Sequence, residues 1–181
     1  SVARRIANAV SDPIEIGDRM ITLSLSIGIA VADAASDLTA SELLHDADLA
    51  VYRAKELGRS RIELCDEALL FEVQQRTIIE GSLRTAIAED ELTMYYQPII
   101  DAKTAKLLSL EALIRWKAPD GAWIPPDLFI PIAERSDLIL ELDNWVVKHV
   151  VDQLVKWTNH PELGDVAVAV NISGRHLASE S

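Results

Sequence analysis

Hydrophobic and polar residues alternate strictly along residues 107–116. One face of this segment carries only apolar side chains, which are Leu108, Leu110, Ala112, Ile114 and Trp116. The opposite face becomes polar toward its C-terminal end, where Glu111 and Arg115 lie. A period of two predicts a β-strand, and polar groups at the C-terminal ends of parallel strands build the active sites of α/β barrels. The segment therefore predicts either part of such a site or an ion pair on a solvated face.

The rest of the C-terminal half predicts a hairpin, two helices and a further strand. The predicted elements are a strand at 92–101, a short helix from Pro125 to Glu134, a helix at 138–157 and a strand at 166–173. Pro98 favours an edge position or an irregular end for the first of these strands, because proline cannot donate to a ladder. The loop 101–106 is short enough for a hairpin with 107–116. The strands 107–116 and 166–173, joined through a helix, then form a parallel pair.

The helix predicted at 138–157 is amphipathic. Its apolar side consists of Leu142, Val146, Val150 and Leu154, widened by Val147, Val151 and Trp157. Its polar side consists of Glu141, Asn144, Lys148, Asp152 and Lys156. We expect the apolar side to pack on the sheet.

The N-terminal half predicts a smaller α/β region followed by a helical linker. The predicted elements are a helix at 1–10, a hairpin of 14–16 with a long strand at 19–30, a helix after Thr39, a strand at 61–64 and a helix at 66–90. Thr39 to Glu42 has the capping-box pattern, and Gly58 is placed to end the helix. Glu80 and Arg84 are spaced as an i,i+4 ion pair on the linker helix.

Glu111 and Asn171 fall on the small or polar faces of the two predicted parallel strands, near their C-terminal ends. If those faces line a barrel, the two side chains converge at its mouth. Both offer oxygen ligands, and oxygen-only ligation favours Mg²⁺ or Mn²⁺ over Zn²⁺. Asn171 could instead cap the turn after its strand.

Composition limits the partners that the chain can take. The 181 residues suffice for one domain or two small ones, and the net charge of −12 opposes contact with nucleic acid polymers and anionic membranes. The single cysteine, Cys65, excludes an intrachain disulfide and fits a cytoplasmic location. No apolar run approaches the roughly 18 residues of a membrane span, although a parent protein could carry an upstream membrane or sensory domain.

Several motifs in the C-terminal half closely resemble the first part of an EAL domain, the cyclic-di-GMP phosphodiesterase family. They are Tyr96-Gln97-Pro98-Ile99-Ile100-Asp101, Glu111-Ala112-Leu113-Ile114-Arg115-Trp116, Phe129-Ile130-Pro131-Ile132-Ala133-Glu134, Leu142-Asp143-Asn144-Trp145-Val146-Val147 and Val170-Asn171-Ile172-Ser173. The resemblance covers residues 83–181. It implies a (β/α) barrel with an antiparallel first strand, and departs from the common pattern at Ser136-Asp137 and at Gly174-Arg175-His176.

The EAL resemblance implies roles for individual residues. Glu111 and Asn171 match two metal ligands, and Gln97, Leu113 and Arg115 match positions that hold the dinucleotide. In the family, two cations, Mg²⁺ or Mn²⁺, activate a water that cleaves one phosphodiester bond of cyclic-di-GMP to give linear pGpG. The family's paired aspartates, catalytic lysine and remaining glutamate would lie beyond the last residue of this chain.

Residues 52–61, with Ser26-Ile27-Gly28-Ile29-Ala30, resemble the C-terminal half of a GGDEF domain, the diguanylate cyclase family. The signature turn of that family is absent from this chain. By position, Lys55 and Arg59 would be vestigial contacts to nucleotide phosphates. The alternative is a solvated helix end, where cations are stabilised by the helix dipole.

The combined prediction is a mixed α/β chain of bacterial cyclic-di-GMP signalling, cut within two domains. We expect a partial GGDEF domain at 1–65, a linker helix at 66–90 and a partial EAL domain at 91–181 with its first three strands. The parent is expected to be a phosphodiesterase that takes cyclic-di-GMP, whereas the segment alone is expected to be inactive and to associate or swap through its open edge. A degenerate module that binds cyclic-di-GMP or a protein partner without catalysis is the alternative.

Overall fold

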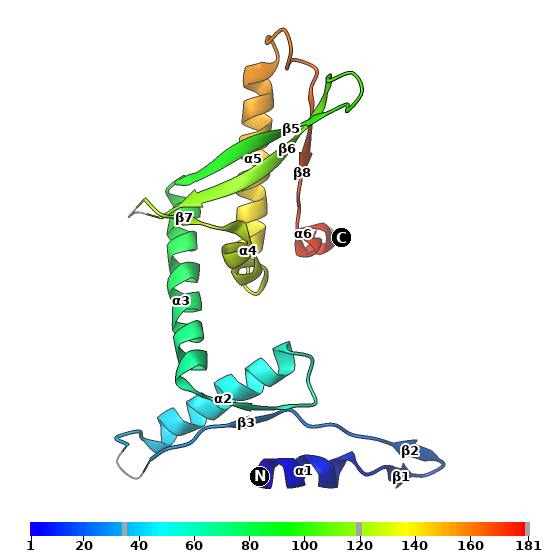
Figure 1. Ribbon diagram of the computed structural model, residues 1–181, viewed down its shortest axis with the longest axis vertical. Helices are drawn as coiled ribbons and strands as arrows, with labels where there is room; N and C mark the ends of the chain where they lie inside the picture. Colours follow the sequence, from blue (N-terminus) through cyan, green and yellow to red (C-terminus); the bar gives the residue numbers. More distant parts are fainter. Residues whose placement is uncertain (34–35, 119–120, 180–181) are drawn as a thin grey trace. The chain divides into compact units, whose positions relative to one another are not determined.

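The computed structural model describes residues 1–33, 36–118 and 121–179, and Figure 1 labels its helices and strands. The chain divides into two compact units, residues 1–75 and 76–181, with the boundary inside helix α3 (Glu67–Ala88). Across the described residues, no helix is both long and apolar enough to traverse a bilayer.

The first unit contains a hairpin and a parallel strand pair. Its elements are α1 (Val2–Ser11), β1 (Ile14–Ile16), β2 (Arg19–Ile21), β3 (Ile27–Ile29), α2 (Ala40–Glu56) and β4 (Ile62–Leu64). Strands β1 and β2 pair antiparallel, as Gly17-Asp18 predicts, and β3 pairs in parallel with β4. The single strand predicted at 19–30 is wrong, because its two ends, β2 and β3, hydrogen-bond to different partners in separate sheets.

Helix α2 packs closely on β3 at Gly28. A Cβ added to Gly28 would lie 2.2 Å from the carbonyl oxygen of Ala47 and 2.4 Å from the backbone nitrogen of Val51. Only glycine therefore permits this approach of helix to strand. The predicted capping box is confirmed, because the Thr39 Oγ1 accepts from the Glu42 N–H at 3.3 Å and the Glu42 carboxylate accepts from the Thr39 N–H at 2.8 Å. The Thr39 hydroxyl and N–H hold the pKa of Glu42 below its ordinary value.

Helix α3 packs through Leu83 and Ala86, which are buried. The predicted pair of Arg84 with Glu80 is not formed, because the Arg84 guanidinium contacts Glu141 on another helix at 3.3 Å. Directly after α3, the Asp90 carboxylate accepts a hydrogen bond from the Trp145 indole at 2.7 Å and lies 2.9 Å from His149 Nε2. The Asp90 carboxylate therefore holds the end of α3 against Trp145 and His149.

The second unit is a sheet covered on one face by helices. Its elements after α3 are β5 (Leu92–Ile100), β6 (Leu107–Lys117), β7 (Trp123–Ile124), α4 (Pro126–Glu134), α5 (Leu138–Trp157), β8 (Ala167–Val170) and α6 (Gly174–Ser179). The hairpin β5–β6 is antiparallel, and β8 runs parallel to β6, as predicted. The short strand β7 was not predicted; it pairs with the C-terminal end of β6.

Strand β6 is the partner of every other strand in this sheet. Strand β5 follows one edge of β6 from Leu92 opposite Trp116 to Ile100 opposite Leu107, while β7 and β8 pair with β6 as well. Among the described strands β5 pairs only with β6, so the edge position predicted from Pro98 is confirmed. In the loop after β5, the backbone N–H groups of Thr104 and Lys103 hold the pKa of Asp101 below its ordinary value.

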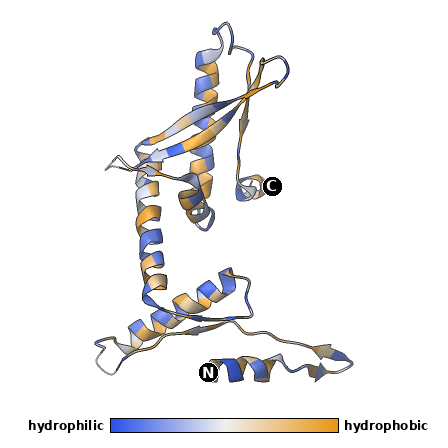
Figure 2. Ribbon diagram, viewed as in Figure 1, coloured by the Kyte–Doolittle hydropathy of each residue, from blue (hydrophilic) through white to orange (hydrophobic). Residues whose placement is uncertain are grey.

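The core of this unit lies between the apolar face of β5 and β6 and the helices α3, α4 and α5. Trp116 and Phe129 are fully buried and meet edge to face, with ring centroids 5.5 Å apart. Figure 2 shows hydrophobic and hydrophilic positions interleaved along α3 and α5, as expected of helices with one packed face. The predicted apolar side of α5 is too wide, because Val147 and Val151 are exposed at 40% and 51%.

Candidate functional site

Four of the residues predicted to form a site lie on one face of the sheet. In the hairpin, Gln97 is opposite Glu111 and Tyr95 is opposite Leu113, and Arg115 lies two positions beyond Leu113 on β6. Directly opposite residues in an antiparallel pair share a face, and residues two apart on a strand do as well. Gln97, Glu111, Leu113 and Arg115 therefore project from the face opposite the apolar core.

Asn171 joins this set from the neighbouring parallel strand. Ala169 on β8 is the partner of Glu111, and Asn171 follows it by two positions, one residue past the end of the strand. Asn171 Nδ2 donates a hydrogen bond of 2.9 Å to Glu111 Oε1, although the two residues are 60 positions apart. The βαβ connection through α5 thus brings together the two side chains whose convergence the sequence predicts.

Arg115 does not pair with Glu111, so the alternative of an ion pair on this strand is wrong. Arg115 Nη1 donates to the carbonyl oxygen of Ile114 at 2.8 Å, and its guanidinium carbon lies 5.8 Å from the centre of the Tyr95 ring. An arginine over an aromatic face is held by cation–π attraction while its remaining N–H groups can reach a ligand. The half-buried guanidinium is therefore a preorganised cation at the end of β6.

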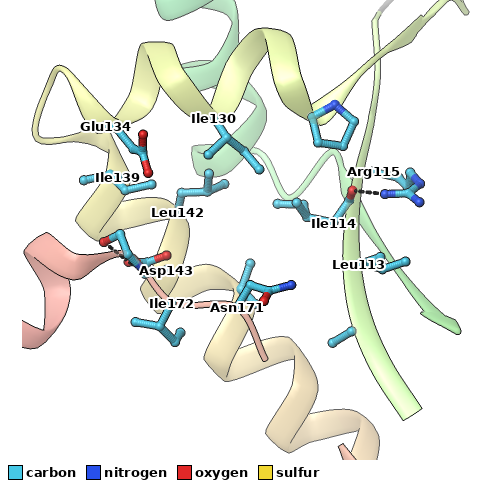
Figure 3. Close-up of a pocket in the computed structure, with 14 residues that line it drawn as sticks. Leu113, Ile114, Arg115, Ile130, Glu134, Ile139, Leu142, Asp143, Asn171 and Ile172 are labelled. Atoms are coloured by element: carbon cyan, nitrogen blue, oxygen red, sulfur yellow. Dashed lines mark hydrogen bonds between the residues drawn. The ribbon is translucent and has the colours of Figure 1, made fainter. Parts of the chain in front are cut away.

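A cavity of about 320 Å³ opens beside these residues, between the C-terminal ends of β6 and β8 and the helices α4 and α5 (Figure 3). Its polar lining includes Arg115, Glu134 and Asn171, and its apolar lining includes Ile130 and Leu142. Ligand pockets commonly combine an apolar wall with a few convergent polar groups. Neither Glu111 nor Gln97 is part of this lining.

Asp143 is a polar residue of this region that the sequence prediction missed. It is only 5% exposed, and its Oδ2 accepts hydrogen bonds from the Ser173 N–H at 3.1 Å and the Ser173 hydroxyl at 2.5 Å. Position 143 is four residues after Ile139 and three before Val146, both buried on α5. Helical spacing alone could therefore have shown that this carboxylate faces the interior.

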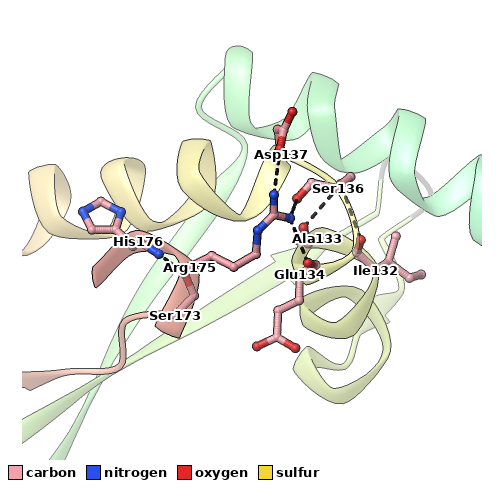
Figure 4. Close-up of polar contacts among 8 residues, drawn as sticks. All are labelled: Ile132, Ala133, Glu134, Ser136, Asp137, Ser173, Arg175 and His176. Atoms are coloured by element: carbon pink, nitrogen blue, oxygen red, sulfur yellow. Dashed lines mark hydrogen bonds and ion pairs between the residues drawn. The ribbon is translucent and has the colours of Figure 1, made fainter. Parts of the chain in front are cut away.

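Arg175 connects the turn after β8 to the loop between α4 and α5, as Figure 4 shows. Its Nη1 donates to the carbonyl oxygens of Glu134 at 3.0 Å and Ser136 at 2.7 Å, and its Nη2 donates to Asp137 Oδ1 at 2.9 Å. The carbonyls lie at the C-terminal end of α4, where a cation is favourable. Asp137, a departure from the common EAL pattern, is thus bound by this arginine.

Lys55 and Arg59 lie in the first unit, at and just after the end of α2. Both are exposed, and the Arg59 backbone has a φ of +63° after Gly58. Exposed cations at a helix end fit the solvated alternative. Their role as phosphate contacts stays a prediction.

The Glu111 carboxylate and the Asn171 side-chain amide can each offer an oxygen atom as a metal ligand. Oxygen ligands fit a hard divalent cation. Within the described parts of the chain, no three or more His, Cys, Asp or Glu side chains come together as a metal-binding group. Glu111 and Asn171 would accordingly supply two ligands, and water or ligand oxygens from elsewhere would complete the coordination.

Comparison with known proteins agrees with this geometry. The family model "EAL domain" matches residues 80–181, and the model "Diguanylate cyclase, GGDEF domain" matches residues 1–61. The chain is 38% identical over 182 residues to the cyclic di-GMP phosphodiesterase PdeR of Escherichia coli, covering all of this chain and 27% of PdeR. It is 35% identical over 181 residues to the signaling protein YkoW of Bacillus subtilis, covering 99% of this chain and 22% of YkoW. The chain thus spans about a quarter of the length of these relatives.

Two solved structures resemble the chain in fold and sequence. The Xanthomonas citri FimX EAL domain in complex with c-diGMP matches with a TM-score of 0.51 and 26% identity, covering 62% of this chain and 42% of that one. The PaMucR phosphodiesterase, in a c-di-GMP complex, matches with a TM-score of 0.50 and 30% identity, covering 56% of this chain and 43% of that one. The predicted fold class, a mixed α/β chain with part of an EAL β/α barrel, is confirmed. The chain therefore belongs to the EAL-domain family, with a GGDEF region preceding its EAL region.

Proposed function

We propose that the EAL region of this chain contributes one side of a phosphodiesterase site that hydrolyses cyclic-di-GMP to pGpG in bacterial signalling. The observation that supports it most strongly is the 2.9 Å contact between Asn171 and Glu111, at the ends of two parallel strands. Such strand ends are where β/α barrels build active sites. The relative PdeR is a cyclic di-GMP phosphodiesterase, which supports the same reaction here.

In this proposal, Glu111 and Asn171 hold a divalent cation, Mg²⁺ or Mn²⁺, with two cations in a complete site. When bound, such cations activate water and neutralise charge that develops on the phosphate during in-line displacement. Glu111 supplies the negative charge of the ligand pair, and Asn171 supplies a neutral oxygen once its amide turns that oxygen toward the cation. Their hydrogen bond keeps both groups at the same place before the cation arrives.

Arg115 binds a phosphate of the dinucleotide in this proposal. A guanidinium offers paired N–H donors that match two phosphate oxygens, and the Tyr95 ring holds it at the edge of the cavity. Gln97, opposite Glu111 on the same face, offers an amide to a ribose or base edge. Leu113, between Glu111 and Arg115, provides an apolar surface against which the ligand packs.

The test is turnover of cyclic-di-GMP by the full-length protein, followed as pGpG by chromatography. We expect turnover with Mg²⁺ or Mn²⁺ and none after chelation by EDTA. A matched control is Glu91→Gln, which alters an exposed carboxylate outside the site and should leave the rate unchanged. Tight binding of cyclic-di-GMP without metal-dependent turnover would contradict the phosphodiesterase proposal and support a module that binds the dinucleotide without catalysis.

A further inference from the structure

The position of Asn171 is not fixed by the β-sheet itself. The pairing of β6 with β8 ends at Ala112 and Val170, so Asn171 is the first residue beyond the ladder. It belongs to the three-residue turn that leads into α6 at Gly174. Whatever holds this turn therefore decides where the Asn171 amide lies relative to Glu111.

Asp143 holds this turn from the side of α5. Its buried Oδ2 accepts both the N–H and the hydroxyl of Ser173, two residues after Asn171. The hydroxyl contact of 2.5 Å has the length of a charge-assisted hydrogen bond. The Ser173 Oγ in turn accepts the backbone N–H of His176 at 3.2 Å. One hydroxyl thus links the carboxylate of α5 to the first turn of α6.

Because Asp143 is buried, its carboxylate needs the hydrogen bonds from Ser173 in place of those from water. A carboxylate that is 5% exposed is costly unless hydrogen-bond donors compensate it. Ser173 supplies two such donors, and the ring nitrogen Nδ1 of His176 lies 3.7 Å from the same carboxylate oxygen. These contacts hold the backbone N–H and the hydroxyl of Ser173 against the buried carboxylate of Asp143.

Arg175 holds the same turn from the opposite side. Its three hydrogen bonds to Glu134, Ser136 and Asp137 join α6 to the end of α4 and the loop that follows it, and Glu134 also lines the cavity. Both sequence departures from the common EAL pattern take part in these contacts, because Asp137 accepts from Arg175 and His176 lies beside Asp143.

We propose that Asp143 is a positioning residue, which acts through Ser173 to hold the Asn171 amide against Glu111. Its effect on the amide stands by itself, while its effect on cation binding rests on the proposed phosphodiesterase site. Outer residues that orient a metal ligand typically change metal affinity 10- to 100-fold when removed. We expect loss of the Ser173 hydroxyl to weaken Mn²⁺ binding within that range.

The experiment compares three variants in the full-length protein. Ser173→Ala removes the hydroxyl donor, whereas Asp143→Asn keeps one carbonyl oxygen that can accept both Ser173 donors. Asp152→Ala changes an exposed carboxylate on the polar side of α5 and serves as the matched control. Circular dichroism of each variant establishes that the protein remains folded.

The first readout is the side-chain amide resonance of Asn171 in metal-free protein labelled with [¹⁵N]asparagine, assigned with Asn171→Ser. The second is Mn²⁺ affinity by calorimetry. We expect Ser173→Ala to shift the Asn171 resonance and weaken Mn²⁺ binding about 10- to 100-fold, Asp143→Asn to stay within about threefold of wild type, and Asp152→Ala to change neither.

An unchanged Asn171 resonance in folded Ser173→Ala would overturn the positioning role. If wild-type protein binds no Mn²⁺, the proposed phosphodiesterase function is contradicted instead. In that case the resonance of Asn171 in the metal-free protein still decides whether Asp143 and Ser173 position the amide.

Discussion

Replacing Gly28 by alanine should destabilise the first unit without altering the second. The added Cβ would lie 2.2 Å from the Ala47 carbonyl oxygen, 2.4 Å from the Val51 nitrogen and 2.8 Å from Val51 Cγ2, whereas ordinary contacts begin at 3.4 Å. Two of these three atoms belong to the helix backbone, so no side-chain rotation relieves the overlap. Helix α2 must move away from β3 by about 1 Å.

That movement would loosen the packing of α2, on which Ala50 and Ala54 are fully buried. Overpacking of a core costs about 1–3 kcal/mol and sometimes more. We expect the upper end of that range, because the atoms in conflict are backbone atoms. With a urea dependence of about 1 kcal/mol per M for a unit of this size, the unfolding midpoint of the first unit falls by about 2–3 M.

The distribution of tryptophan makes the two units separable in one titration. All four tryptophans, which are Trp116, Trp123, Trp145 and Trp157, lie in the second unit. Tryptophan fluorescence therefore reports the second unit, while far-UV circular dichroism reports both. In Gly28→Ala the dichroism should show an early transition while the fluorescence midpoint stays in place.

Gly81→Ala is the matched control for this experiment. Gly81 lies within α3 with no atom within 4 Å of an added Cβ, so alanine should raise stability by about 0.5–1 kcal/mol through helix propensity. A Gly28→Ala protein whose dichroism midpoint remains within about 0.3 M of wild type would refute the packing argument. It would mean that α2 does not approach β3 at this glycine.

The remaining predictions concern the site and the hairpin loop. Glu111→Gln in the full-length protein should abolish metal-dependent turnover, since a neutral amide replaces the charged ligand; near-native pGpG production at saturating Mg²⁺ would show that Glu111 is not a ligand. Arg115→Ala should weaken cyclic-di-GMP binding by about 1.5–3 kcal/mol, measured by calorimetry, with residual turnover retained. The pKa of Asp101 is lowered by the Thr104 and Lys103 N–H groups, so its contribution to stability is present above its unfolded pKa and disappears as pH falls through the folded pKa. Melting temperatures of Asp101→Asn and wild type should therefore converge as pH is lowered below about 4, and a constant difference would contradict this role.

Local patterns in the sequence predict much of the second unit. The alternation at 107–116, the capping signals and the helical spacing at 138–157 depend on contacts that each element makes along its own face. The convergence of Glu111 with Asn171 follows from the same patterns, because a parallel βαβ unit places equivalent strand ends side by side. The functional roles proposed for these residues rest on family resemblance, since alternation identifies a face but not a ligand.

Local sequence patterns could not predict the features that depend on which strand or side chain a segment contacts. The break between β2 and β3 occurs because each end of the segment pairs in a different sheet, which no pattern within 19–30 records. Helical spacing places Asp143 on the buried face of α5, but the Ser173 donors that compensate its carboxylate lie thirty residues away and are visible only in the folded chain. The exposure of Val147 and Val151 likewise depends on which side of α5 the sheet occupies.

The pairing of β5 and β8 with β6 bears on the order in which the sheet forms during folding. The β5–β6 hairpin closes across a short loop, whereas β8 reaches β6 only after the chain has passed through α4 and α5. Contacts distant in sequence pay a larger loop-closure cost and generally form later in folding. Glu111 would therefore be in its strand well before Asn171 arrives beside it. Glu111 and Asn171 are 60 residues apart in the chain. Formation of their hydrogen bond would therefore report that β8 has paired with β6.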